Sequence, residues 1–104
     1  MQKNEAPHYI AHVEADLASL IPGFLVNRQK DLVDLESALA AKDFQKLQRI
    51  GHTLRGVAGS YGFDLIGEYG TEIERAAQLG EAPLIEQNLK KMLEFLQYVE
   101  VIYV

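Results

Sequence analysis

Apolar residues recur at steps of three and four positions along most of the chain, and this spacing is the strongest constraint on the fold. On an α-helix such residues share one face, so each stretch predicts a helix that buries a single apolar stripe. Four stretches follow one another, beginning near Ile21, Asp43, Asp64 and Pro83. Because only short connections separate them, the pattern favours an all-α, antiparallel up-down-up-down four-helix bundle.

Residues that begin or end helices stand at the expected boundaries. Pro22 and Pro83 suit the first turn of a helix, where a missing N–H costs little. Asp43 is a suitable N-cap, and Gly62 and Gly80 predict the ends of the second and third helices.

The two ends of the chain give weaker signals. Residues 1–8 predict a flexible N-terminal arm, residues 9–104 the bundle domain, and residues 14–20 a possible short extra helix. The last helix is expected to continue to Tyr103, because the apolar steps of three and four continue that far. No Asn-Gly or Asp-Gly hairpin signal occurs, so strands are not expected.

Composition excludes several classes of function. The 104 residues include 10 Lys and Arg against 15 Asp and Glu, a net charge of −5 that disfavours binding to nucleic-acid phosphates. The absence of cysteine excludes disulfides and thiolate sites, and it favours a cytoplasmic location. Apolar runs are too short to span a membrane, so no membrane association is expected.

His52 does not fit a purely structural bundle. At about 100° per residue, it lies roughly 160° from the mean direction of the apolar residues of its helix, so it should face solvent. Gly56 and Gly59 fall within roughly 40° of the same direction. Glycine inside a helix costs about 1 kcal/mol relative to alanine, and core packing cannot explain it on the exposed face. We interpret the two glycines as clearance that lets another protein approach the imidazole.

These residues favour a nucleophile that carries a group in transit. An exposed imidazole has a pKa near ~6.5 in water, so at neutral pH a ring nitrogen keeps a free lone pair. Arg55 lies one helical turn from His52 and could contact a phosphoryl group on the ring. An isolated exposed histidine is more often an ordinary surface residue, but the two glycines and Arg55 argue against that interpretation here.

Residues 51–63, Gly-His-Thr-Leu-Arg-Gly-Val-Ala-Gly-Ser-Tyr-Gly-Phe, resemble the signature of histidine-containing phosphotransfer (HPt) domains. That signature is approximately His-x-Leu-Lys-Gly, followed by small residues and by a glycine ten positions after the histidine. His52, Leu54, Gly56 and Gly62 occupy its fixed positions. Arg55 replaces the usual lysine, which keeps the charge but brings a planar guanidinium. The resemblance extends more weakly over the rest of the chain.

The resemblance implies a phosphorelay intermediate. His52 would accept a phosphoryl group from an aspartate of a receiver domain, in a response regulator or a hybrid sensor histidine kinase, and pass it to another receiver. The receiver would supply the magnesium ion, so the chain itself would be no enzyme and would need no cofactor or metal. Gln48, Arg49, Gly56 and Gly59 are expected to contact the partner, with Gln45 and apolar atoms near Leu20 and Ile21 at the edge of that surface.

Other candidates are weaker. His8 and His12 could share a helix face as metal ligands, but in a loose arm we expect no metal site. Glu72 and Glu74 are two positions apart and are expected to form a solvated face without a chemical role. Gly67 and Gly70 predict close packing of the third helix beside the His52 helix.

Two alternatives to the phosphocarrier remain. One is a non-catalytic bundle that binds a partner through the His52, Gly56 and Gly59 face. The other is a homodimer formed through the last helix, although a monomer is expected.

Overall fold

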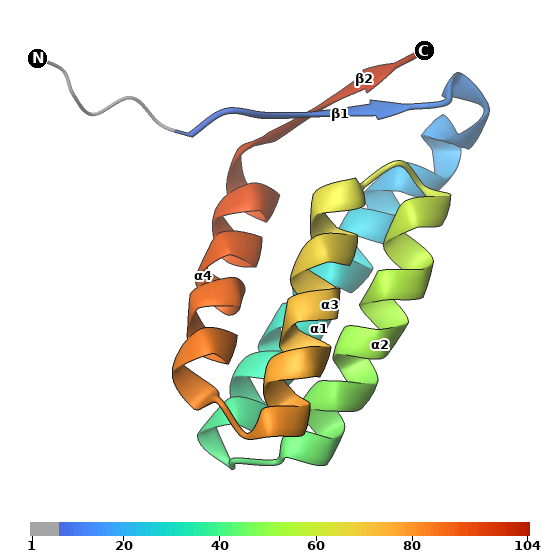
Figure 1. Ribbon diagram of the computed structural model, residues 1–104. Coiled ribbons are helices and arrows are strands. Elements are labelled where there is room, and N and C mark those ends of the chain that lie inside the picture. The colour runs from blue at the N-terminus through green and yellow to red at the C-terminus, as the bar shows by residue number, and fades with distance from the viewer. Residues whose placement is uncertain (1–6) are drawn as a thin grey trace, which may run out of the picture.

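The computed structural model describes residues 7–104, which form four long helices capped at one end by two short strands (Figure 1). The elements are β1 (Tyr9–Val13), the 3₁₀ helix η1 (Ala15–Leu20), α1 (Ile21–Ala40), α2 (Phe44–Ser60), α3 (Asp64–Leu79), α4 (Ala82–Tyr98) and β2 (Val99–Tyr103). Successive helices run in opposite directions, as the colour sequence in Figure 1 shows. The predicted four-helix bundle is therefore confirmed.

The apolar stripes meet in a single core. Each of the four long helices contributes buried side chains, and aromatic rings gather toward the end of the bundle that the strands cover, where Phe63 lies 5.0 Å from Phe24 and 6.3 Å from Phe95 between ring centroids. The largest fully buried side chains are Phe63, Ile21, Leu35, Leu47, Leu54, Ile66, Ile73, Ile85, Met92 and Val13.

The predicted helix boundaries are confirmed at the first three helices. The Asp43 carboxylate accepts a hydrogen bond of 3.1 Å from the backbone N–H of Lys46 and so caps α2. Gly62 and Gly80 have φ of +85° and +67°, a left-handed conformation that favours glycine. Pro22 and Pro83 stand in the first turns of α1 and α4.

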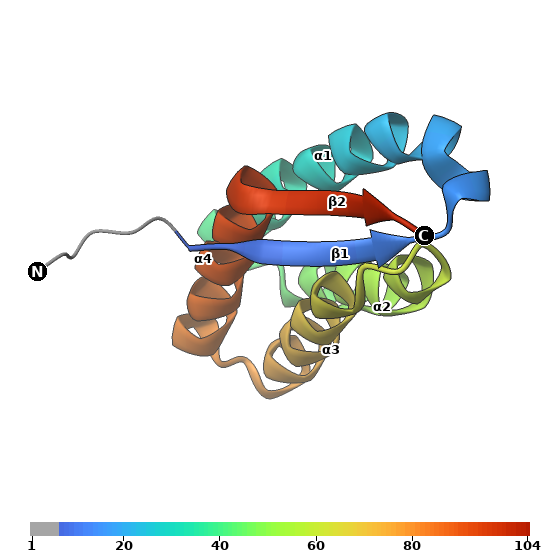
Figure 2. The same ribbon diagram turned by 90° about the horizontal axis from the view of Figure 1, so that it is seen from above.

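The two ends of the described chain pair as a parallel two-stranded sheet, so the expectation of no strands was wrong. Tyr9 pairs with Val99 and Val13 with Tyr103, and Figure 2 shows the strands side by side across the end of the bundle. The last helix therefore ends at Tyr98 rather than Tyr103. The β-branched residues of the segment Val99–Tyr103 favour an extended backbone, and pairing with β1 satisfies its hydrogen bonds.

β1 lies in the part of the chain expected to be bundle, next to the expected arm. Residues 1–6 of that arm lie outside the described residues. The Tyr9 hydroxyl donates a hydrogen bond of 2.6 Å to Glu94 of α4, and this bond raises the pKa of Tyr9 to about 12. The strand is thus tied to the bundle by its side chains as well as by β2. The short extra helix expected at residues 14–20 is present as the 3₁₀ helix η1.

α2 and α3 approach each other more closely than helices with side chains at the contact could. A Cβ atom on Gly51 would lie 2.7 Å from the backbone oxygen of Gly70 and 2.8 Å from the backbone nitrogen of Glu74. A Cβ on Gly70 would lie 2.7 Å from the Cβ of Leu54. The expected close packing at Gly70 is confirmed, and Gly51 is its partner on α2.

This contact predicts opposite effects for two alanine substitutions on α2. Gly51→Ala should lower the free energy of unfolding by about 1–3 kcal/mol, because the new methyl meets backbone atoms that cannot move aside. Gly56→Ala should raise it by about 0.5–1 kcal/mol, because a Cβ there meets no atom within 4 Å and alanine favours the helix. Urea denaturation measures both, and equal effects would contradict the close contact.

Candidate functional site

His52 projects from the middle of α2 into solvent. Its side chain is 62% exposed, whereas Leu47, Leu54 and Ala58 on the opposite side of the helix are completely buried. The core packing of these three residues fixes the rotation of α2 and so the direction of the imidazole. The exposure predicted from helical periodicity is confirmed.

Two glycine positions lie on the His52 face of α2, toward the C-terminal end of the helix. Gly56 and Gly59 are both exposed, and a Cβ atom built on either would have no atom of a neighbouring element within 4 Å. Neither glycine has a positive φ, so backbone conformation does not require glycine there. The two positions thus leave open space along α2 on the face that carries His52.

Glu74 of α3 is the neighbour of His52 that sequence reasoning missed. Its Oε2 lies 3.0 Å from His52 Nδ1, and its side chain is only 14% exposed. The expected solvated position is therefore wrong for Glu74, which is largely buried against His52. The signal that could have found it is the glycine pair, because Gly70 lies one turn before Glu74 and Gly51 directly precedes His52, so the close contact brings the two side chains together.

Arg55 completes a cluster of three side chains. Its Nη1 lies 3.4 Å from Glu74 Oε1, and its Nη2 lies 3.1 Å from His52 Nδ1. One neutral tautomer cannot satisfy both neighbours of Nδ1, because a carboxylate only accepts and a guanidinium only donates. We favour the tautomer with hydrogen on Nδ1: Glu74 is largely buried and held in place, whereas the Arg55 side chain is 51% exposed and can move. The Nδ1–H then donates to Glu74, and Nε2 keeps its lone pair.

Several shallow hollows border the histidine helix, and two of them are lined by residues predicted to contact a partner. One, of about 300 Å³, is lined by Gln45, Gln48, Arg49, His52 and Thr53. The other, of about 340 Å³, lies between α1 and α2 and is lined by Leu20, Gly23, Phe24, Asn27, Arg28, Val57 and Tyr61. The predicted contact residues Gln48 and Arg49 thus line the same hollow as the imidazole, and Leu20 lines the neighbouring one. Ile21 is 2% exposed and takes no part in this surface.

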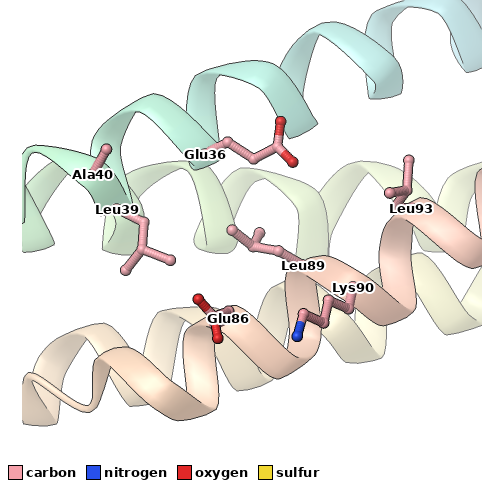
Figure 3. A pocket seen from close by; sticks show the side chains of 7 residues that line it. All are labelled: Glu36, Leu39, Ala40, Glu86, Leu89, Lys90 and Leu93. Carbon is pink, nitrogen blue, oxygen red and sulfur yellow. The ribbon is translucent and has the colours of Figure 1, made fainter.

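A larger hollow of about 500 Å³ lies between α1 and α4, as Figure 3 shows. Leu39, Leu89 and Leu93 give it an apolar floor, and Glu36, Glu86 and Lys90 stand at its sides. It contains no histidine, and no residue of α2 lines it. His52 is therefore separate from this groove.

Neither a metal-binding cluster nor a membrane-spanning helix is present in the described residues 7–104. No group of three or more His, Cys, Asp or Glu side chains there is placed to hold a metal ion. No helix in the same range has the length and apolar character needed to cross a membrane. His8 Nε2 lies 3.0 Å from Oε1 of Glu100 in β2.

The tautomer of His52 gives a test of the Glu74 contact. Long-range ¹H–¹⁵N NMR at about pH 8, where an imidazole is neutral, should show hydrogen on Nδ1 in the unsubstituted protein. Glu74→Leu removes the acceptor and should move the hydrogen to Nε2. Glu72→Leu is the matched control, because Glu72 pairs with Arg75 and not with His52. Identical tautomers in both variants would show that Glu74 does not orient the ring.

The chain was compared with known proteins. The family model described as the Hpt domain matches residues 19–100. Neither the curated proteins nor the solved structures gave a match.

Proposed function

Because the chain belongs to the Hpt domain family, whose members serve phosphotransfer in two-component signalling, we propose that His52 accepts a phosphoryl group from a receiver-domain aspartate and passes it to another. The observation that carries this proposal is an exposed imidazole beside two glycines that leave room for a second protein. A nucleophile that must reach an aspartate on another protein has to project from a surface that protein can approach.

The transfer is a displacement at phosphorus. The Nε2 lone pair attacks the phosphorus of the aspartyl phosphate, the N–P bond forms, and the P–O bond to the aspartate breaks. The electron pair of that bond stays on the aspartate, which leaves as a carboxylate. Onward transfer is the reverse reaction, with the carboxylate of the second receiver as nucleophile and Nε2 as leaving group.

Glu74 and Arg55 have complementary roles in this step. Formation of the N–P bond puts positive charge on the ring, and the Glu74 carboxylate 3.0 Å from Nδ1 stabilises that charge while it holds the Nδ1 hydrogen. Arg55 is free to turn from Nδ1 toward the phosphoryl oxygens, where a guanidinium binds well. Both residues act on the histidine, so substitution of either should slow transfer without abolishing it.

The docking surface extends from His52 along α2. Gly56 and Gly59 allow close approach on one side, and Gln48 and Arg49 provide polar contacts on the other. Leu20 is 52% exposed beside this surface and offers apolar contact area. The partner is a receiver domain of a response regulator, of a hybrid sensor histidine kinase, or of both.

We further propose that the chain acts in the cytoplasm as a monomer. It uses no cofactor of its own, and it carries the phosphoryl group rather than acting as an enzyme. The α2 surface binds neither nucleic acid nor membrane.

A second candidate function is a bundle that binds its partner through the same glycine-lined face without chemistry. The open space beside His52 fits this function as well. The two candidates differ in whether the imidazole becomes phosphorylated.

Phosphoryl labelling distinguishes the two functions. Incubation with receiver domains phosphorylated by acetyl phosphate should label the unsubstituted protein with a base-stable, acid-labile phosphoryl group. His52→Gln should remain unlabelled because it lacks the nucleophile, while circular dichroism shows an unchanged helix content. Equal labelling of both proteins would show that another residue carries the phosphoryl group and would refute the role of His52. Labelling of neither protein would favour binding without chemistry.

A single side chain added at Gly59 should obstruct the partner and slow phosphoryl transfer. Gly59→Leu should slow labelling by about a hundredfold, because the leucine occupies the open space that the partner must enter, and an obstructed approach raises the barrier by several kcal/mol. Gly80→Ala is a control at the far end of α3, where it changes local backbone strain but not the His52 face. Normal transfer by Gly59→Leu would show that the partner does not approach over this glycine.

A further inference from the structure

The helix that carries His52 has an unusual charge. Between Phe44 and Ser60, α2 contains Lys46, Arg49 and Arg55 and no Asp or Glu, although the chain as a whole has a net charge of −5. Each of the other three long helices contains acidic residues, and α3 combines four carboxylates with one arginine. Positive charge is therefore concentrated on the helix with the nucleophile.

The cations of α2 lie on both sides of the imidazole along the helix. Arg49 precedes His52 by three residues and Arg55 follows it by three, so each is about 4.5 Å away along the axis and within roughly 60° around it. Arg49 is exposed and lines the hollow next to His52. Lys46 lies farther along the same helix, toward its N-terminus.

Arg49 and Lys46 are not neutralised inside the protein. Arg55 faces the Glu74 carboxylate, but the ion pairs of residues 7–104 include neither Arg49 nor Lys46. By contrast, Arg28 and Arg75 on the neighbouring helices are each paired with a carboxylate on their own helix. The charge of α2 thus remains available to a partner.

We propose that the surface that docks on α2 is acidic, and that Arg49 and Lys46 attract it before contact. This inference rests on the proposed phosphotransfer, and it adds the charge of the partner and the residues that recognise it. An aspartyl phosphate is itself anionic, so a cationic approach path favours its arrival at His52. Because Arg49 is exposed and Lys46 is partly exposed, we expect them to change the association rate more than the stability of the complex.

Charge reversal at two positions provides the experiment. Arg49→Glu and Lys91→Glu change the net charge equally, and Lys91 is an exposed residue of α4 that forms none of the ion pairs above. The rate of labelling is measured with receiver domains phosphorylated by acetyl phosphate, at protein concentrations where association limits the rate. Salt is varied from about 10 mM, where the screening length is near 30 Å, to about 1 M, where it is near 3 Å.

Arg49→Glu should reduce the labelling rate about tenfold at low salt, and the loss should shrink to within about twofold at high salt. Lys91→Glu should stay within about twofold of the unsubstituted protein under both conditions. Equal rates for the two variants at low salt, with the unsubstituted protein labelled normally, would overturn the acidic docking surface and leave the proposed function intact. An unlabelled unsubstituted protein would instead refute the phosphotransfer itself.

Discussion

The backbone contact between α2 and α3 is the constraint on which the site depends. Gly51 and Gly70 let the two helices meet without side chains between them, and a Cβ on either would clash with the other helix at 2.7 Å. This spacing places Glu74 beside the imidazole of His52, at 3.0 Å from Nδ1. With a larger residue at Gly51 or Gly70, α2 and α3 would move apart and the Glu74 carboxylate would no longer contact the imidazole. A packing feature of the core therefore determines which group contacts the exposed imidazole.

The remaining glycines of α2 serve the opposite purpose. Gly51 is buried and permits an internal contact, whereas Gly56 and Gly59 are exposed and leave space for an external one. Exposed Arg49 and partly exposed Lys46 add the positive charge that we propose attracts an acidic partner to that space. One helix thus combines an imidazole in contact with Glu74 of α3, two exposed glycines and three basic residues. The proposed transfer needs no deep pocket, because the receiver domain would complete the reaction site.

The sequence predicted the bundle and the exposed histidine because both follow from local spacing. Asp43, Gly62 and Gly80 marked helix ends through their own backbone or capping preferences, and the period of the apolar residues gave the direction of His52. The β1–β2 sheet was missed because it joins the two ends of the domain, and such long-range pairing leaves no turn signal. Val99 and Tyr103 also fit the helical spacing of α4, so only the pairing with Tyr9 and Val13 distinguishes strand from helix. Glu74 was missed because its position beside His52 depends on how closely α2 and α3 pack. The sequence indicated close packing at Gly70 but did not identify Gly51, 19 positions earlier, as its partner.

The most direct test of the central claim is the position of the phosphorus on His52. Protein labelled with ¹⁵N in its histidines is incubated with receiver domains phosphorylated by acetyl phosphate, and the imidazole is observed by ¹⁵N and ³¹P NMR. A phosphorus coupled to Nε2, with hydrogen retained on Nδ1 toward Glu74, is the predicted result. Phosphorus on Nδ1, or an imidazole that stays unmodified while the receiver loses its phosphoryl group to water, would contradict it.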